Sequence, residues 1–132
     1  MRSLRCAVTV AAIALGGCTA DQGHDAATPS ATPTVAQVAN CLSEPETRPA
    51  RITVTCADAN LAVSDIAWSS WTSDSALGSG TQHLNTCEPS CASGQQQSTP
   101  VTVRLSAPEN DRFTRIEINS QDGSAQVYPL PH

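Results

Sequence analysis

The chain has 132 residues, a formal net charge of −5 and only seven cationic side chains, all of them arginine. So few dispersed arginines form neither the basic patch that nucleic acid requires nor one for anionic lipid headgroups. The absence of lysine also excludes a Walker lysine, Schiff-base chemistry and a Ser-x-x-Lys hydrolase dyad.

The first 17 residues have the order of an export signal. A basic start with Arg2 and Arg5 precedes an apolar run from Cys6 to Leu15, and Gly16-Gly17-Cys18 follows. The apolar run spans about ten residues, whereas a helix needs about 20 residues to cross a bilayer. We therefore expect a cleaved signal helix, with an ordinary signal-peptidase site or a retained anchor as the alternatives.

The sequence Leu15-Gly16-Gly17-Cys18 resembles the lipobox of bacterial lipoprotein precursors. In that family a diacylglycerol is attached to the Cys sulfur, and cleavage makes this Cys the first residue. The resemblance implies a signal peptide over 1–17, lipidation of Cys18, and a protein anchored by lipid to the extracytoplasmic face of the cell membrane. Removal of the signal would leave five Arg against 12 Asp plus Glu, a formal charge of −7.

The segment 19–40 is rich in Ala, Thr, Ser and Pro and holds almost no large apolar side chain. Such a segment buries too little surface to offset the entropy lost on ordering. We therefore expect 18–40 to be the lipidated Cys and a disordered tether, followed by a domain over 41–132. The Thr and Ser residues among the prolines are also typical of an O-glycosylated stalk, so a bare linker and a glycosylated one both remain open.

Alternation of apolar and polar residues predicts strands in the domain, whereas no window of it has a sustained helical stripe. The predicted strands, the clearest first, are 52–56, 101–105, 116–118, 125–128, 65–71 and 80–87. Asp122-Gly123 predicts a hairpin turn, and Pro100 and Pro108 are expected to bound the 101–105 strand. Short strands between turns predict an all-β fold, a small antiparallel sandwich or barrel.

Four cysteines remain once Cys6 leaves with the signal and Cys18 carries lipid: Cys41, Cys56, Cys87 and Cys91. An even number in a short exported domain predicts two disulfides. Three connectivities exist. The turn-prone Glu-Pro-Ser spacer favours a Cys87–Cys91 bond, which would leave Cys41–Cys56, but the sequence alone leaves the connectivity open.

Two patterns could hold a metal. His83-x3-Cys87-x3-Cys91 has helical ligand spacing for zinc or copper, yet Pro89 disfavours that helix and exported thiols oxidise. Asp58 and Asn60 offer oxygens for calcium, but these residue types are also ordinary turn formers. We expect no metal and no cofactor.

A second resemblance covers most of 41–106. Its residues are Arg48-Pro49, Ile52-x-Val54-x-Cys56-Ala57-Asp58-x-Asn60, Trp68-x-x-Trp71, Ala76-x-Gly78-x-Gly80, Asn85-x-Cys87-x-Pro89-x-Cys91-Ala92-x-Gly94 and Pro100-Val101-x-Val103. Together they are similar to a group of small secreted actinobacterial proteins with no assigned activity. This resemblance supports the expected fold and the extracytoplasmic location, and it implies no particular function. The chain departs from that pattern at Ala59, where Gly is usual, and at Gln95–Gln97, which replaces a more aromatic stretch.

Trp68 and Trp71 are three residues apart, so in a regular strand they point to opposite faces. Trp68 shares a face with Ile66 and is expected in the core. Trp71 would then be exposed among small polar residues, where it could stack on a sugar or a peptide, and it is the candidate binding residue. In the alternative, a bulge or a helical turn buries both rings.

No Gly-x-Ser-x-Gly nucleophile elbow occurs, and Gly78-Ser79-Gly80 is expected to be a flexible turn. His83 is the only histidine between the tether and the C-terminal residue that could act as a base. We expect no enzyme but an envelope interaction or accessory module whose partner is an envelope protein or a glycan. The alternative is a lipoprotein that binds a small ligand, a glycan or a metal.

Overall fold

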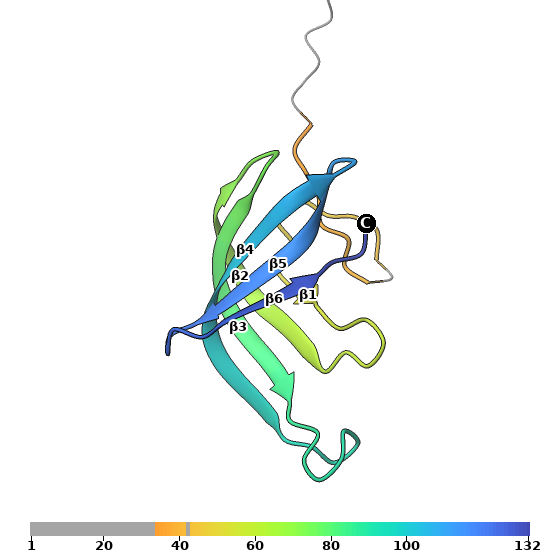
Figure 1. The fold of residues 1–132 in the computed structure, drawn as a ribbon, viewed down its shortest axis with the longest axis vertical. Coiled ribbons are helices and arrows are strands. Elements are labelled where there is room, and N and C mark those ends of the chain that lie inside the picture. The colour runs from red at the N-terminus through yellow and green to blue at the C-terminus, as the bar shows by residue number, and fades with distance from the viewer. Residues whose placement is uncertain (1–33, 42) are drawn as a thin grey trace, which may run out of the picture. The chain divides into compact units, whose positions relative to one another are not determined.

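The computed structural model describes residues 34–41 and 43–132, so the signal peptide, Cys18 and the first part of the tether lie outside the described residues. The described part is all-β. One antiparallel sheet with strand order β1-β2-β3-β4-β5-β6 curls into a half-barrel (Figure 1). The strands are β1 (Ile52–Thr53), β2 (Leu61–Trp71), β3 (Ala76–Asn85), β4 (Gln96–Glu109), β5 (Arg112–Ser120) and β6 (Ala125–Pro129). The predicted all-β antiparallel fold is confirmed.

The core lies on the concave face of the curled sheet. In β4 the alternate residues Val101, Val103 and Leu105 are buried, whereas Thr102 and Arg104 between them are exposed. Their partners across the sheet, among them Ala76 in β3 and Ile116 and Ile118 in β5, are buried on the same face. Because side chains alternate along a strand, this pattern assigns the two faces of every strand paired with β4.

Pro100 and Pro108 lie inside β4 rather than at its ends, so the expected short strand is wrong in length. Pro100 pairs with Thr81, but β5 ends where Ser120 meets Val101. The Thr86 N–H donates to the Gln95 carbonyl, which makes the Thr81–Pro100 pair a non-hydrogen-bonded one. The nitrogen of Pro100 therefore points away from β3, toward the side on which β5 does not extend this far. No ladder hydrogen bond is lost.

Two tight turns join the last three strands. Asn110 and Asp111 both have positive φ (50° and 60°) and connect β4 to β5, as a two-residue type I′ hairpin requires. Gly123 (φ 88°) follows Asp122 in the turn between β5 and β6, where the Gly123 N–H donates to the Ser120 carbonyl at 3.1 Å. The turn that Asp122-Gly123 predicted is thus confirmed.

Two register shifts in β2 turn both tryptophans to the concave face. The pairing with β3 slips between Ser64 and Ala67 and again between Trp68 and Ser70. The first shift turns Trp68 to the core face, and the second adds one residue between Trp68 and Trp71, so the parity that separates them in a regular strand is lost. Trp71 is only 8% exposed and belongs to the core, while Trp68 is half-buried beside it. The expected exposure of Trp71 is wrong, and with it the basis for choosing Trp71 as a binding residue.

Gly78 and Gly80 are part of β3 and not of a flexible turn, which corrects the expectation for Gly78-Ser79-Gly80. A Cβ on Gly78 would lie 2.9 Å from the Trp68 ring, and one on Gly80 would lie 2.7 Å from the Ser64 carbonyl oxygen. Glycine is required here because the shifted part of β2 approaches β3 closely.

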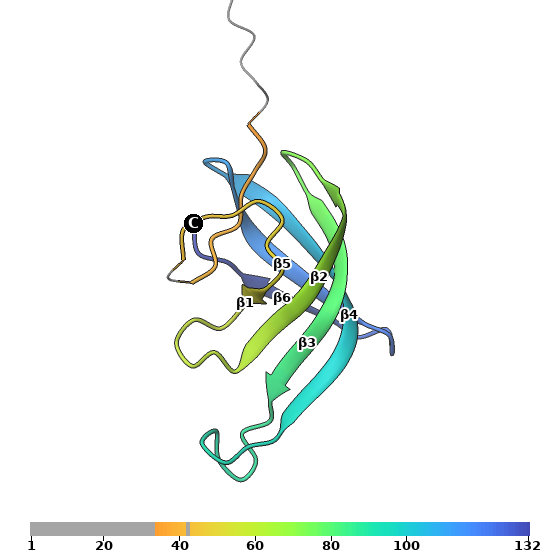
Figure 2. The same ribbon diagram turned by 180° about the vertical axis from the view of Figure 1, so that it is seen from behind.

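The segment before β1 closes one end of the half-barrel. Gln37 bridges to β5: its N–H donates to the Asp111 carbonyl at 2.8 Å, and its own carbonyl accepts from the Phe113 N–H at 2.9 Å. Figure 2 shows this segment, in orange, entering beside β5. Ala36 and Val38 are buried in the core. Residues 36–39 therefore belong to the folded domain, which corrects the expected end of the tether at residue 40.

Candidate functional site: a polar trough on the concave face

The concave face continues beyond the core as a polar surface. The β3–β4 pairs Gln82–Thr99 and Leu84–Gln97 lie on the same face as Gly80–Val101, but β5 ends at Val101. β3 and β4 therefore extend past the turn that joins β5 to β6 (Figure 1). The overhang leaves this part of the concave face uncovered.

A cavity of about 250 Å³ occupies this overhang, and we call it the trough. It is lined by Gln82, Leu84, Gln97, Thr99, Ser120, Gln121, Asp122 and Gln126. Four of these residues carry a carboxamide and two a hydroxyl, so the lining both donates and accepts hydrogen bonds. The side chain of Leu84 adds an apolar contact.

Asp122 is the one ionisable residue of the lining, and its carboxylate already has partners. Its Oδ1 accepts from the Ser124 hydroxyl at 2.6 Å and from the Ser124 N–H at 2.8 Å. These hydrogen bonds favour the charged form and lower the pKa of Asp122 below the ordinary value for an aspartate. At neutral pH the trough therefore has a negative charge at its rim and no cation in its lining.

Gln82 is the unusual residue of the trough. Its side chain is only 7% exposed, the least of any polar residue in the described ranges. Within those ranges its carboxamide has no hydrogen-bond partner, although it retains some access to the cavity that it lines. Gln126 differs, since its Oε1 accepts from the Tyr128 hydroxyl at 2.8 Å. The carboxamide atoms of Gln82 are accessible from the cavity, so they are able to bond to water or to a ligand there.

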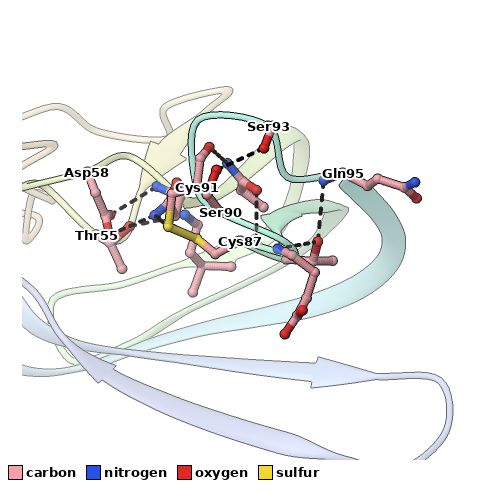
Figure 3. The surroundings of a disulfide bond; sticks show 12 residues. Thr55, Asp58, Cys87, Ser90, Cys91, Ser93 and Gln95 are labelled. Carbon is pink, nitrogen blue, oxygen red and sulfur yellow. Dashed lines mark hydrogen bonds between the residues drawn. A yellow bond between two sulfur atoms is a disulfide. The ribbon is translucent and has the colours of Figure 1, made fainter.

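The predicted cysteine sites form two disulfides, Cys41–Cys56 and Cys87–Cys91, the pairing that the Glu-Pro-Ser spacer favours. Figure 3 shows the second disulfide beside the loop that holds Asp58. Asn60 connects the two loops, because its Nδ2 lies 2.8 Å from Asp58 Oδ2 and 3.5 Å from Cys87 Sγ. The suggested calcium ligands thus bond to each other in a turn.

Asp58 also accepts the Asn60 backbone N–H, at 3.1 Å. This hydrogen bond is the main reason that the pKa of Asp58 lies below the ordinary value for an aspartate, and the Thr55 hydroxyl contributes next. Asp58 therefore holds the loop in place as a carboxylate.

His83 lies on the convex face of β3, away from the disulfide sulfurs. Its Nε2 is 2.8 Å from Ser64 Oγ and its Nδ1 is 3.0 Å from Ser98 Oγ. Because the Ser64 hydroxyl donates to Asp65, the Ser64 oxygen accepts from the Nε2–H of His83. Among residues 34–41 and 43–132, no three His, Cys, Asp or Glu side chains are grouped as metal ligands. The same residues include no helix long and apolar enough to cross a membrane.

Sequence reasoning missed the trough, although one signal was present. The alternation that continues from Val101 through Thr99 to Gln97 places these polar residues on the core face. Comparison with protein-family models found no match, and comparisons with curated proteins and with solved structures found none either.

Proposed function

We propose that the protein is a lipoprotein anchored through Cys18 to the extracytoplasmic face of the cell membrane, where it acts as a non-catalytic interaction module. Two disulfides in a domain of about 100 residues are the observation that carries this proposal. Disulfides persist in oxidising compartments and are rare in the cytosol, so an exported protein is favoured. The LGGC sequence supplies the anchor.

The arrangement of the strands suits a module that reaches outward from a membrane. Gln37, near the first described residues, contacts Asp111 in the β4–β5 turn. The trough lies at the other end of β5, beside Ser120 and Asp122. The first described residues and the trough are therefore at opposite ends of β5.

The position of His83 favours a non-catalytic role. Ser98 and His83 have the separation of a nucleophile and a base, but both lie on the convex face and neither lines the trough. A hydrolase would need a substrate cavity at the nucleophile and donors for the developing oxyanion. The alternative function, binding of a small ligand or glycan, is favoured by the trough, whose polar lining includes the accessible carboxamide of Gln82.

Lipidation is tested by expressing the full chain in a bacterium fed an alkyne fatty acid. The wild-type protein should carry the label and sediment with membranes. Cys18→Ala should lose the label and leave the membrane fraction, because two or more acyl chains are needed for stable anchoring. Cys6→Ala is the matched control, as this cysteine lies within the signal, and it should keep both properties. Unchanged labelling of Cys18→Ala would refute the proposal.

A further inference from the structure

We infer that the trough binds an uncharged, polyhydroxylated ligand, the chemical class of glycans, and that Gln82 is its central contact. The inference rests on the proposed function in one respect, the extracytoplasmic location in which the protein would encounter the ligand. The site itself is defined by the overhang of β3 and β4 beyond β5.

Gln82 is the central polar residue of the site. The residue as a whole is 7% exposed, and its carboxamide, with one acceptor oxygen and two N–H donors, is accessible from the cavity and makes no hydrogen bond to the described residues. The Cβ atoms of its cross-strand neighbours, Val63 in β2 and Thr99 in β4, face the same side of the sheet. The amide therefore stands at the boundary between core and trough, where a ligand hydroxyl could both donate to it and accept from it.

The rest of the lining matches hydroxyl groups better than charged groups. Gln97, Thr99 and Gln126 present further donors and acceptors from two strands, and Leu84 can cover the C–H face of a sugar ring. An anion would find no cation in the lining and would meet Asp122 at the rim. A cation would find the Asp122 carboxylate already bonded to Ser124. A volume of about 250 Å³ is just below the usual range for ligand sites and suits a small ligand.

The test uses the full lipidated chain, purified in a zwitterionic detergent that has no sugar headgroup. The probes are glucose, galactose, mannose, arabinose and N-acetylglucosamine with their disaccharides. Binding is measured by NMR, from the side-chain amide signals of the protein labelled with ¹⁵N-glutamine. At least one probe should shift the Gln82 amide signal saturably at millimolar or lower concentration. Absence of saturable shifts with every probe would overturn the inference, and so would tighter binding of a glucuronate, a glucosamine or a tripeptide.

Matched variants separate binding from folding. Gln82→Met keeps the length of the side chain and removes the amide, so it should weaken binding at least tenfold while the melting temperature stays equal or rises. Gln97→Met, at an exposed position of the trough, should weaken binding severalfold. Gln96→Met is the control, since Gln96 is the adjacent exposed residue on the convex face, and its binding should be unchanged.

Full binding by Gln82→Met and Gln97→Met, or equal weakening by Gln96→Met, would refute the site. The melting temperature of each variant shows whether a loss of binding comes from unfolding. Lipid labelling at Cys18 is measured independently of binding. Failure of the glycan site and failure of the membrane proposal therefore give different results.

Discussion

At the scale of single residues, Trp71 links three parts of the chain. Its indole N–H donates to the Ala36 carbonyl at 2.8 Å, and its ring meets Phe113 and Trp68 edge to face, with centroids 5.6 and 4.7 Å away. Trp71→Ala should lower the free energy of unfolding by about 3–5 kcal/mol, because it empties a buried aromatic site. Denaturant melts measure this loss. Trp68→Ala should cost less, since Trp68 is half-buried; a Trp71 loss below that of Trp68 would contradict the structure.

Asp58 gives a pH dependence of known sign. Because its pKa is lowered in the folded state, the folded protein favours the carboxylate, and the stabilisation is present above the unfolded pKa. It is lost as pH falls through the lower folded value. Wild type should therefore lose more stability than Asp58→Asn when the pH is lowered from about 5 to about 2. Thermal melts across this range decide it, and a larger loss in Asp58→Asn would show that the sign is wrong.

At the scale of elements, the segment before β1 stabilises the sheet that it closes. Val38 is fully buried, and its N–H and carbonyl both bond to Glu46 at 2.9 Å. Val38→Ala should cost about 2 kcal/mol, at the low end for truncation of a buried aliphatic side chain. Val35→Ala is the control, because Val35 is 44% exposed, and it should change stability by less than about 0.5 kcal/mol. Equal stability of the two variants would mean that the segment is dispensable.

The same elements show which parts of the fold can be predicted from sequence. Alternation in β4 and β5 is local, so the buried faces of Val103 and Ile118 follow directly from the pattern. The register shifts that bury Trp71 depend on how β2 meets β3, and no short window contains that information. Val38 packs against residues far along the chain, so its Ala- and Thr-rich surroundings in the sequence predicted disorder. The trough was missed because it depends on which strands end first.

At the scale of the whole molecule, the sheet has a closed apolar end and an open polar end. Phe113 and the segment around Val38 fill the first, while Gln82 and Gln97 line the second. Most of the buried apolar side chains lie outside the trough lining, although Leu84 of the trough packs against them. Substitution of the polar residues of the trough should therefore cost little stability, and any effect should fall on the binding proposed for this face.

The two disulfides should stabilise this molecule unequally. Cys41–Cys56 spans 15 residues and joins the closing segment to the loop after β1, whereas Cys87–Cys91 spans four residues within the β3–β4 connection. Because a cross-link that closes a longer loop removes more entropy from the unfolded chain, loss of the first should cost about 3 kcal/mol and loss of the second about 2 kcal/mol.

Denaturant melts of the paired alanine variants, Cys41→Ala with Cys56→Ala and Cys87→Ala with Cys91→Ala, measure both losses. The larger loss should fall on the first pair also because Asn40, next to Cys41, accepts the Thr53 N–H and donates to the Arg51 carbonyl, both at 2.9 Å. These bonds hold β1 only while the segment stays in place. A greater loss from the Cys87 and Cys91 pair would mean that the β3–β4 connection, and not the closing segment, limits the stability of the half-barrel.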